Sequence, residues 1–168
     1  MSAPSVHGDS DGLLRNAISY ALSNSHIICT SDGRYELFVQ LLDQQSSDRI
    51  GFRYDRQSSS SQNLLVSIEG RKNVVAEITL KDCANGRTLL EKKQITASSD
   101  YDHIDSDALQ DLLVFTPSPK LSLHFSGGQL DTIEGAESGV AAPLMRKLAD
   151  KILQEVEMAT STIPETIQ

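Results

Sequence analysis

Two stretches of alternating apolar and polar residues, 34–56 and 63–82, constrain the fold of this chain more than any other feature. Alternation with a period of two is typical of β-strands that have one buried and one exposed face. The stretches are similar in length, and a polar segment, QSSSSQ at 57–62, lies between them. The pattern therefore predicts a long antiparallel hairpin whose tip is the serine-rich segment.

The first arm of this hairpin changes phase along its length. Its apolar residues occupy odd positions in 35–41 but even positions in 50–54. Because successive side chains of a strand point to opposite faces, one regular strand cannot bury both sets on the same face. We therefore expect a bulge or a break within residues 43–49. The second arm needs no such shift, since the even positions of 64–68 and again of 74–80 are all apolar.

Helical periodicity is found on both sides of the hairpin. Apolar residues recur at spacings of three and four in 11–24 and again in 139–158, which predicts two amphipathic helices. Asp9 or Ser10 is expected to cap the first helix. Pro143 suits the first turn of the second helix, and a helix that begins earlier is expected to kink there.

Turn signals place the remaining elements. Asn85-Gly86 favours a tight turn because both residues tolerate positive φ, so a third strand is expected over about 87–97. Residues 98–120 are expected to be irregular, with a short helix at 106–113.

These elements together predict an α+β fold in which two amphipathic helices pack on one face of a small β-sheet with a long protruding hairpin. Residues 1–8 are expected to hold the remnant of a strand before the first helix. We expect one domain over 1–158 and a disordered C-terminal tail over 159–168.

The distribution of charge limits the class of partner. The net charge of −8 argues against nucleic-acid binding, which usually needs a basic surface. Residues 49–72 nevertheless hold five basic and two acidic side chains, whereas 100–111 hold five aspartates and no basic residue. A locally positive region on an acidic protein can bind an anionic partner. It can also belong to an ordinary mixed, solubilising surface.

No motif for a nucleotide, a metalloprotease or a hydrolase nucleophile is present, so we expect no cofactor, no bound metal and no enzymatic activity. The acidic segment 98–107 lacks the glycine and glutamate of a calcium loop, which favours a solvated loop. Asp102 and His103 with a serine would make a hydrolytic set only if the fold brought them together. Cys29 and Cys83 are expected to be buried free thiols, although a disulfide stays open.

The arginine-rich end of the first arm, IGFRYDR at 50–56, is the strongest candidate for a binding surface. Arginine with aromatic residues is a composition suited to anionic amphiphiles or to protein interfaces. The alternative is a strand edge that arginines keep soluble and unpaired. The candidate residues for binding a ligand or partner are Phe52, Arg53, Tyr54, Arg56, Arg71 and Lys72.

Several fragments and the order of the elements resemble the lipopolysaccharide-assembly lipoprotein (LptE-like) family. The fragments are HGDSDGLLRNAISYAL (7–22), RYELFVQLLD (34–43), IGFRYDR (50–56), EGRKNVVAEITLKDCANGRTLL (69–90) and GQLDTIEGAESGVAAPLMRKLADKI (129–152). The resemblance covers most of the chain and is that of a divergent member of the family. It implies two helices against one face of a mixed four-stranded sheet.

The resemblance also implies a function. Such a protein is held by a lipid anchor on the periplasmic face of the outer membrane. It plugs or supports a partner β-barrel that inserts lipopolysaccharide, and it contacts lipopolysaccharide itself. Cys29 follows the first helix and cannot be the lipidated residue, so we expect the sequence to begin after its leader and anchor. Without the resemblance, the expectation is a small cytoplasmic adaptor that binds protein and no lipid.

Overall fold

The computed structural model describes residues 1–25, 27, 30, 32–56, 63–103 and 133–161. The side chains of residues 43–46, 53–56, 63–67 and 133 lie outside the described part. Along the chain the elements are β1 (Ser5–His7), α1 (Leu13–Asn24), β2 (Tyr35–Arg56), β3 (Asn63–Asp82), β4 (Arg87–Asp102) and α4 (Ile133–Ser161).

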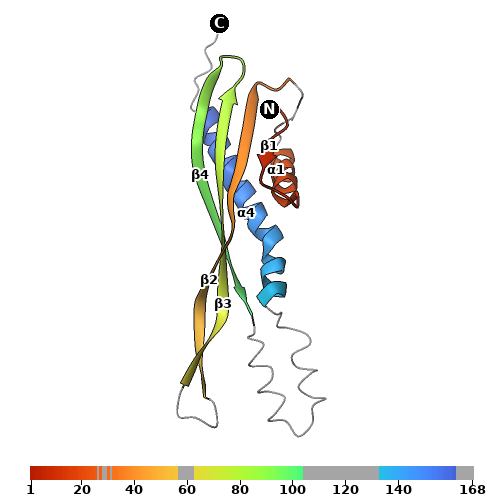
Figure 1. Ribbon diagram of the computed structural model, residues 1–168. Coiled ribbons are helices and arrows are strands. Elements are labelled where there is room, and N and C mark those ends of the chain that lie inside the picture. Colours follow the sequence, from red (N-terminus) through yellow and green to blue (C-terminus); the bar gives the residue numbers. More distant parts are fainter. Residues whose placement is uncertain (26, 28–29, 31, 57–62, 104–132, 162–168) are drawn as a thin grey trace. The chain divides into compact units, whose positions relative to one another are not determined.

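The described strands form a four-stranded sheet in the order β1-β2-β3-β4. β1 runs parallel to β2, with Val6 opposite Val39, whereas β2, β3 and β4 alternate in direction (Figure 1). The sheet is therefore mixed. The predicted α+β fold, with two helices and a mixed sheet, is confirmed, and β1 confirms the strand expected before the first helix.

The predicted hairpin arms correspond to β2 and β3, which are neighbours in the sheet. The predicted tip, 57–62, lies outside the described residues. β2 runs without interruption from Tyr35 to Arg56, so the expected break is wrong. The break was expected because Ile50 and Phe52 were assumed to be buried on the same face as the earlier apolar residues. Ile50 and Phe52 are instead 38% and 48% exposed, so no break is needed to bury them. The alternative, a bulge within 43–49, stays a prediction.

The chain divides into two compact units. The first unit comprises Met1–Ser46, Asn73–Ser98 and Ala142–Gln168, and the second comprises Ser47–Lys72 and Ser99–Ala141. Each of β2, β3, β4 and α4 contributes one part to each unit.

The first unit contains the hydrophobic core. In β3, the even-numbered Val74, Ala76, Ile78 and Leu80 are all 0% exposed, while the residues between them are half-buried. Buried residues of α1 and of α4 belong to the same cluster as this face of β3. Both helices therefore cover one face of the sheet in this unit, as the period-two and helical patterns predict.

The predicted helices are confirmed, with differences at their ends. The Asp9 carboxylate accepts a hydrogen bond from the Arg15 amide at 2.8 Å, which satisfies one of the free amides at the start of α1. α4 begins at Ile133, before the expected start at 139, and Pro143 lies inside it. It continues to Ser161, so residues 159–161 are helical rather than part of a disordered tail. The kink at Pro143 stays a prediction.

The turn before β4 is confirmed, because Gly86 has φ 63 and the strand follows at Arg87. β4 extends to Asp102, so the expectation that residues 98–102 are irregular is wrong. Local sequence carries little strand signal there, and the strand is held by pairing with β3. The helix expected at 106–113 lies outside the described residues.

The expectation that Cys83 is buried is wrong, because its free thiol is exposed. Cys83 follows β3 in the turn toward β4, and its amide donates to the Arg34 carbonyl at 2.7 Å. A turn of this kind lies at the surface. Cys29 lies outside the described residues.

Candidate functional site

All six candidate binding residues belong to the second unit, on β2 and β3. Phe52 is 48% exposed and Ile50, two positions before it, is 38% exposed. Large apolar side chains in water are candidates for contacts with a partner. The side chains of Arg53, Tyr54 and Arg56 lie outside the described part, so the roles of these residues stay predictions.

Arg71 is already engaged with a carboxylate. Its Nε and Nη2 atoms donate to the two oxygens of Asp100 at 2.7 and 3.0 Å, and both side chains are about half exposed. The hydrogen bond with Asp100 and its negative charge raise the pKa of Arg71 above its usual value. An exposed pair adds little to stability, but it orients the guanidinium. An incoming anion would therefore have to compete with Asp100 for Arg71.

The described part of the second unit contains a buried tyrosine, Tyr101 of β4. Its side chain is 8% exposed, and its hydroxyl donates a hydrogen bond to Glu137 Oε1 of α4 at 2.8 Å. The ring lies against Gly70 of β3, where a Cβ atom would come within 2.5 Å of the tyrosine oxygen. Only glycine leaves room for the ring there, so Gly70 allows Tyr101 to link β4 to α4.

Hydrogen bonds and, to a smaller extent, nearby charges hold the carboxyl group of Glu137 ionised. The hydrogen bond from Tyr101 lowers the pKa of Glu137, and a hydrogen bond from Ser47 and the nearby charges of Lys72 and His103 lower it further. Burial, followed by the bond to Glu137, raises the pKa of Tyr101. At neutral pH the pair is therefore an ionised carboxylate and a neutral phenol. The positive charge of Lys72, one of the candidate binding residues, thus contributes to lowering the pKa of Glu137.

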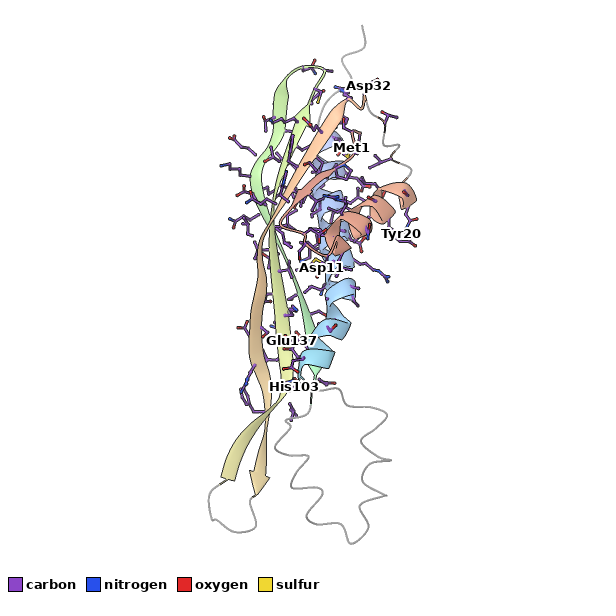
Figure 2. All side chains as sticks on the ribbon, turned by 45° about the vertical axis from the view of Figure 1, so that its right-hand side comes forward. Met1, Asp11, Tyr20, Asp32, His103 and Glu137 are labelled. Carbon is purple, nitrogen blue, oxygen red and sulfur yellow. The ribbon has the colours of Figure 1, made fainter. Side chains whose placement is uncertain are left out.

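His103 lies in the same cluster and is only 4% exposed. Figure 2 shows it beside Glu137, and its ring centroid is 5.8 Å from that of Tyr101. The Nδ1 atom is buried and makes no hydrogen bond with any described residue. Asp102, next to it in the chain, is exposed. The fold thus does not bring Asp102 and His103 together as the hydrolytic set considered from the sequence would require.

Sequence reasoning did not single out Tyr101, Glu137 or Ser47. The signal that could have led to them is Gly70, which lies in the interior of a predicted strand. A glycine there often marks a place where another group approaches the backbone closely. The signal does not say which group approaches, because Tyr101 and Glu137 are far from Gly70 in the sequence.

The first unit also contains a buried charged residue, Asp82, which is 1% exposed. Arg34 donates to its two oxygens at 3.0 to 3.3 Å, and the Ala84 amide and the Asn85 side chain donate at 3.1 Å. The hydrogen bond from Arg34 is the main cause that lowers the pKa of Asp82. Ala84 and Asn85 belong to the turn from β3 to β4, and Arg34 directly precedes β2, so Asp82 ties this turn to the start of β2 and has a structural role.

The first unit also has a shallow groove of about 460 Å³ between α1 and α4. Leu13 and Ala17 give it an apolar floor, and Tyr20, Asn16 and Arg146 line it as well. Within the described residues, no group of three or more His, Cys, Asp or Glu is placed to hold a metal ion. None of the described helices has the length and apolar character needed to cross a membrane.

The pKa of Glu137 leads to a test by acidification. Because its pKa is lowered in the folded state, ionised Glu137 contributes stability that is complete above the unfolded-state pKa of about 4.3. This contribution is lost as the pH falls through the folded-state pKa. We expect Glu137→Gln to melt below the wild type at about pH 7, and we expect the difference to shrink as the pH falls from the unfolded-state pKa through the lowered folded-state pKa.

Thermal melts over this pH range measure the effect. The exposed Glu134 of the same helix is the matched control, and Glu134→Gln is expected to leave the pH profile unchanged. A melting difference between Glu137→Gln and the wild type that stays constant with pH would contradict the assignment.

Comparison with known proteins supports the fold. No protein-family model matches the chain, and no curated protein matches it in sequence. Its structure is similar to that of a putative lipoprotein from Caulobacter crescentus CB15, with a TM-score of 0.50 and 18% identity over 96% of this chain and 93% of that chain. Rare lipoprotein B from Shewanella oneidensis has a TM-score of 0.49 and 12% identity, covering 94% of this chain and 96% of that one.

Proposed function

We propose that this chain is a non-enzymatic envelope lipoprotein that supports an outer-membrane β-barrel in lipopolysaccharide transport and itself contacts lipopolysaccharide. It would be anchored by lipid on the periplasmic face of the outer membrane. The observation that carries the proposal is the likeness of its fold to the lipoprotein from Caulobacter crescentus over 96% of this chain. The sequence fragments that resemble the lipopolysaccharide-assembly lipoproteins support the same function.

The chemistry of the Tyr101 cluster favours binding over turnover. A general acid or base works best when its pKa lies near the working pH. The pKa of Glu137 is lowered and that of Tyr101 is raised, so both move away from neutrality. Such a pair holds β4 and α4 together and is poorly suited to transferring a proton.

The basic end of β2 is the part of the chain best suited to lipopolysaccharide. Arg53 and Arg56 can pair with phosphate groups through charge-assisted hydrogen bonds. Phe52 is exposed on the same strand and can cover apolar surface next to them. Arg71 is a weaker candidate, since Asp100 already occupies its guanidinium.

The partner is tested by purifying the lipid-anchored protein from detergent-solubilised envelopes. The proposal expects one β-barrel protein of the outer membrane to co-purify in near-equimolar amount. A tagged unrelated lipoprotein of similar abundance controls for detergent micelles that hold several proteins. Co-purification of a soluble protein without any barrel would instead support the adaptor alternative and would contradict the proposal.

Lipopolysaccharide contact is tested by reversing two charges. The double variant Arg53→Glu, Arg56→Glu is expected to bind purified lipopolysaccharide at least about tenfold more weakly, because two side chains that attract phosphate groups are replaced by two that repel them. Its free energy of unfolding is expected to change by no more than about 0.5 kcal/mol per substitution.

The matched control reverses two exposed arginines of the first unit, Arg87→Glu and Arg146→Glu. It changes the net charge by the same amount, so a non-specific loss of attraction would appear equally in both variants. Equal weakening in both, or no weakening in either, would remove lipopolysaccharide binding from the end of β2.

A further inference from the structure

One edge of β2 is unpaired over most of its length within the described part of the chain. β1 pairs with β2 only at Phe38–Gln40. Gly8 follows β1 with φ 79, and a Cβ atom there would lie 2.9 Å from the Leu41 carbonyl oxygen. The chain therefore turns away from β2 at Leu41, and no described strand pairs with this edge after Gln40. An unpaired edge of this kind is a template for another strand.

The second half of this edge has a sequence that is complementary to itself. Residues 48–56 read DRIGFRYDR, with Phe52 at the centre. If two such strands pair antiparallel about Phe52, Ile50 lies opposite Tyr54 and Arg49 lies opposite Asp55. In the same register Asp48 lies opposite Arg56. Each charged residue of 48–50 thus meets the opposite charge, and each apolar residue meets another apolar residue.

Neighbouring registers are less favourable. Sliding the strands by one residue sets Asp48 opposite Asp55 in one direction, and Arg49 opposite Arg56 in the other. Sliding by two sets Arg49 opposite Arg53 in one direction and Arg53 opposite itself in the other. Like charges directly opposite each other destabilise a strand pair. The charges therefore select the register that is centred on Phe52.

We propose that two copies of this chain pair edge to edge through β2, antiparallel about a twofold axis at Phe52. The occupant of the edge is a second copy because the complementarity is between the segment and itself. The surface also has the apolar residues that a pair needs, since Phe52 and Ile50 are exposed in the single chain.

The two faces of the paired strands have different roles. Even positions share one face, where the Phe52 residues of both copies meet between two Ile50–Tyr54 pairs. Odd positions share the other face, where two symmetric Arg49–Asp55 pairs lie across the junction. This inference does not depend on the proposed function, because neither a barrel nor a lipid takes part in it.

Charge reversal tests the pairing in solution. Sedimentation equilibrium at roughly 100 µM, a concentration chosen for a small interface, is expected to show dimers of the wild type. Arg49→Asp sets a carboxylate opposite Asp55 at two symmetric places, and Asp55→Arg does the same with two cations. Each single variant is expected to raise the dimer Kd about tenfold or more.

Mixing the two variants provides the rescue. In the mixture, the new carboxylate at position 49 of one copy lies opposite the new guanidinium at position 55 of the other, and the native Asp55 lies opposite the native Arg49. A heterodimer with near wild-type affinity is expected only in the antiparallel register about Phe52. Failure of the mixture to associate more tightly than either variant alone would overturn the proposal, as would a monomeric wild type.

Cross-linking tests the axis. With Cys29→Ser and Cys83→Ser as background, Phe52→Cys is expected to form a disulfide-linked dimer under mild oxidation. Directly opposed residues of antiparallel strands have Cα atoms about 4.5–5.5 Å apart, within disulfide range. Gln40→Cys is the control, since Gln40 is exposed but pairs with His7 of β1. Equal cross-linking from both positions would contradict an axis at Phe52.

Discussion

Replacing Leu148 by alanine is expected to lower the free energy of unfolding by about 2–5 kcal/mol. Leu148 is 0% exposed and lies on α4 within the hydrophobic core of the first unit. Its truncation removes buried apolar surface and leaves a cavity that the surrounding close-packed core residues fill only in part. Urea denaturation measures the loss as a lower midpoint.

Asp150 is the matched control for this substitution. It lies two residues further along α4 and is exposed, so Asp150→Ala is expected to change the free energy of unfolding by about 0.5 kcal/mol at most. If Leu148→Ala had as small an effect as the control, α4 would not pack on the sheet as described. A changed m-value would indicate that unfolding is not two-state.

Replacing Gly70 by alanine is expected to disrupt the second unit. The added methyl group would come within 2.5 Å of the tyrosine oxygen, so the ring of Tyr101 has to move. Movement of the ring breaks the hydrogen bond to Glu137. Overpacking of this kind costs about 1–3 kcal/mol. Urea denaturation followed by tyrosine fluorescence detects it, because the chain contains no tryptophan.

A double-mutant cycle separates the contact from a general effect on the strand. Gly70→Ala is expected to cost much less when Tyr101→Ala has already removed the ring. Gly139→Ala is the control, since a Cβ atom there meets nothing within 4 Å and alanine favours the helix. Additive effects of Gly70→Ala and Tyr101→Ala would contradict the close packing of the two residues.

Periodicity predicted the elements of the fold that have strong local patterns. Both arms of the hairpin, both helices and the Asn85-Gly86 turn were predicted because each depends on residues that are close in the sequence. The errors came where the local pattern is weak. Residues 98–102 carry no clear alternation, yet they belong to β4 because β3 lies beside them. The start of α4 at Ile133 was missed for a similar reason, since glycines at 135 and 139 weaken the helical signal.

The candidate site was predicted less completely than the fold. Charge and aromatic composition pointed to Arg71, but only the structure pairs it with Asp100. Tyr101 and Glu137 are 36 positions apart and were not linked by any motif. Local sequence contains no information about which distant side chains meet across a helix and a strand.

The sequence by itself determined the strands and helices that have a strong local period, and which face of each is apolar, because these depend on backbone geometry and on spacings of two to four residues. Only the tertiary structure decided which charges are neutralised and which apolar residues stay exposed. Arg71 is paired, Glu137 is held ionised, and Phe52 is left in water. These outcomes depend on which groups lie within a few ångströms of one another, and that distance is set by the packing of segments far apart in the chain.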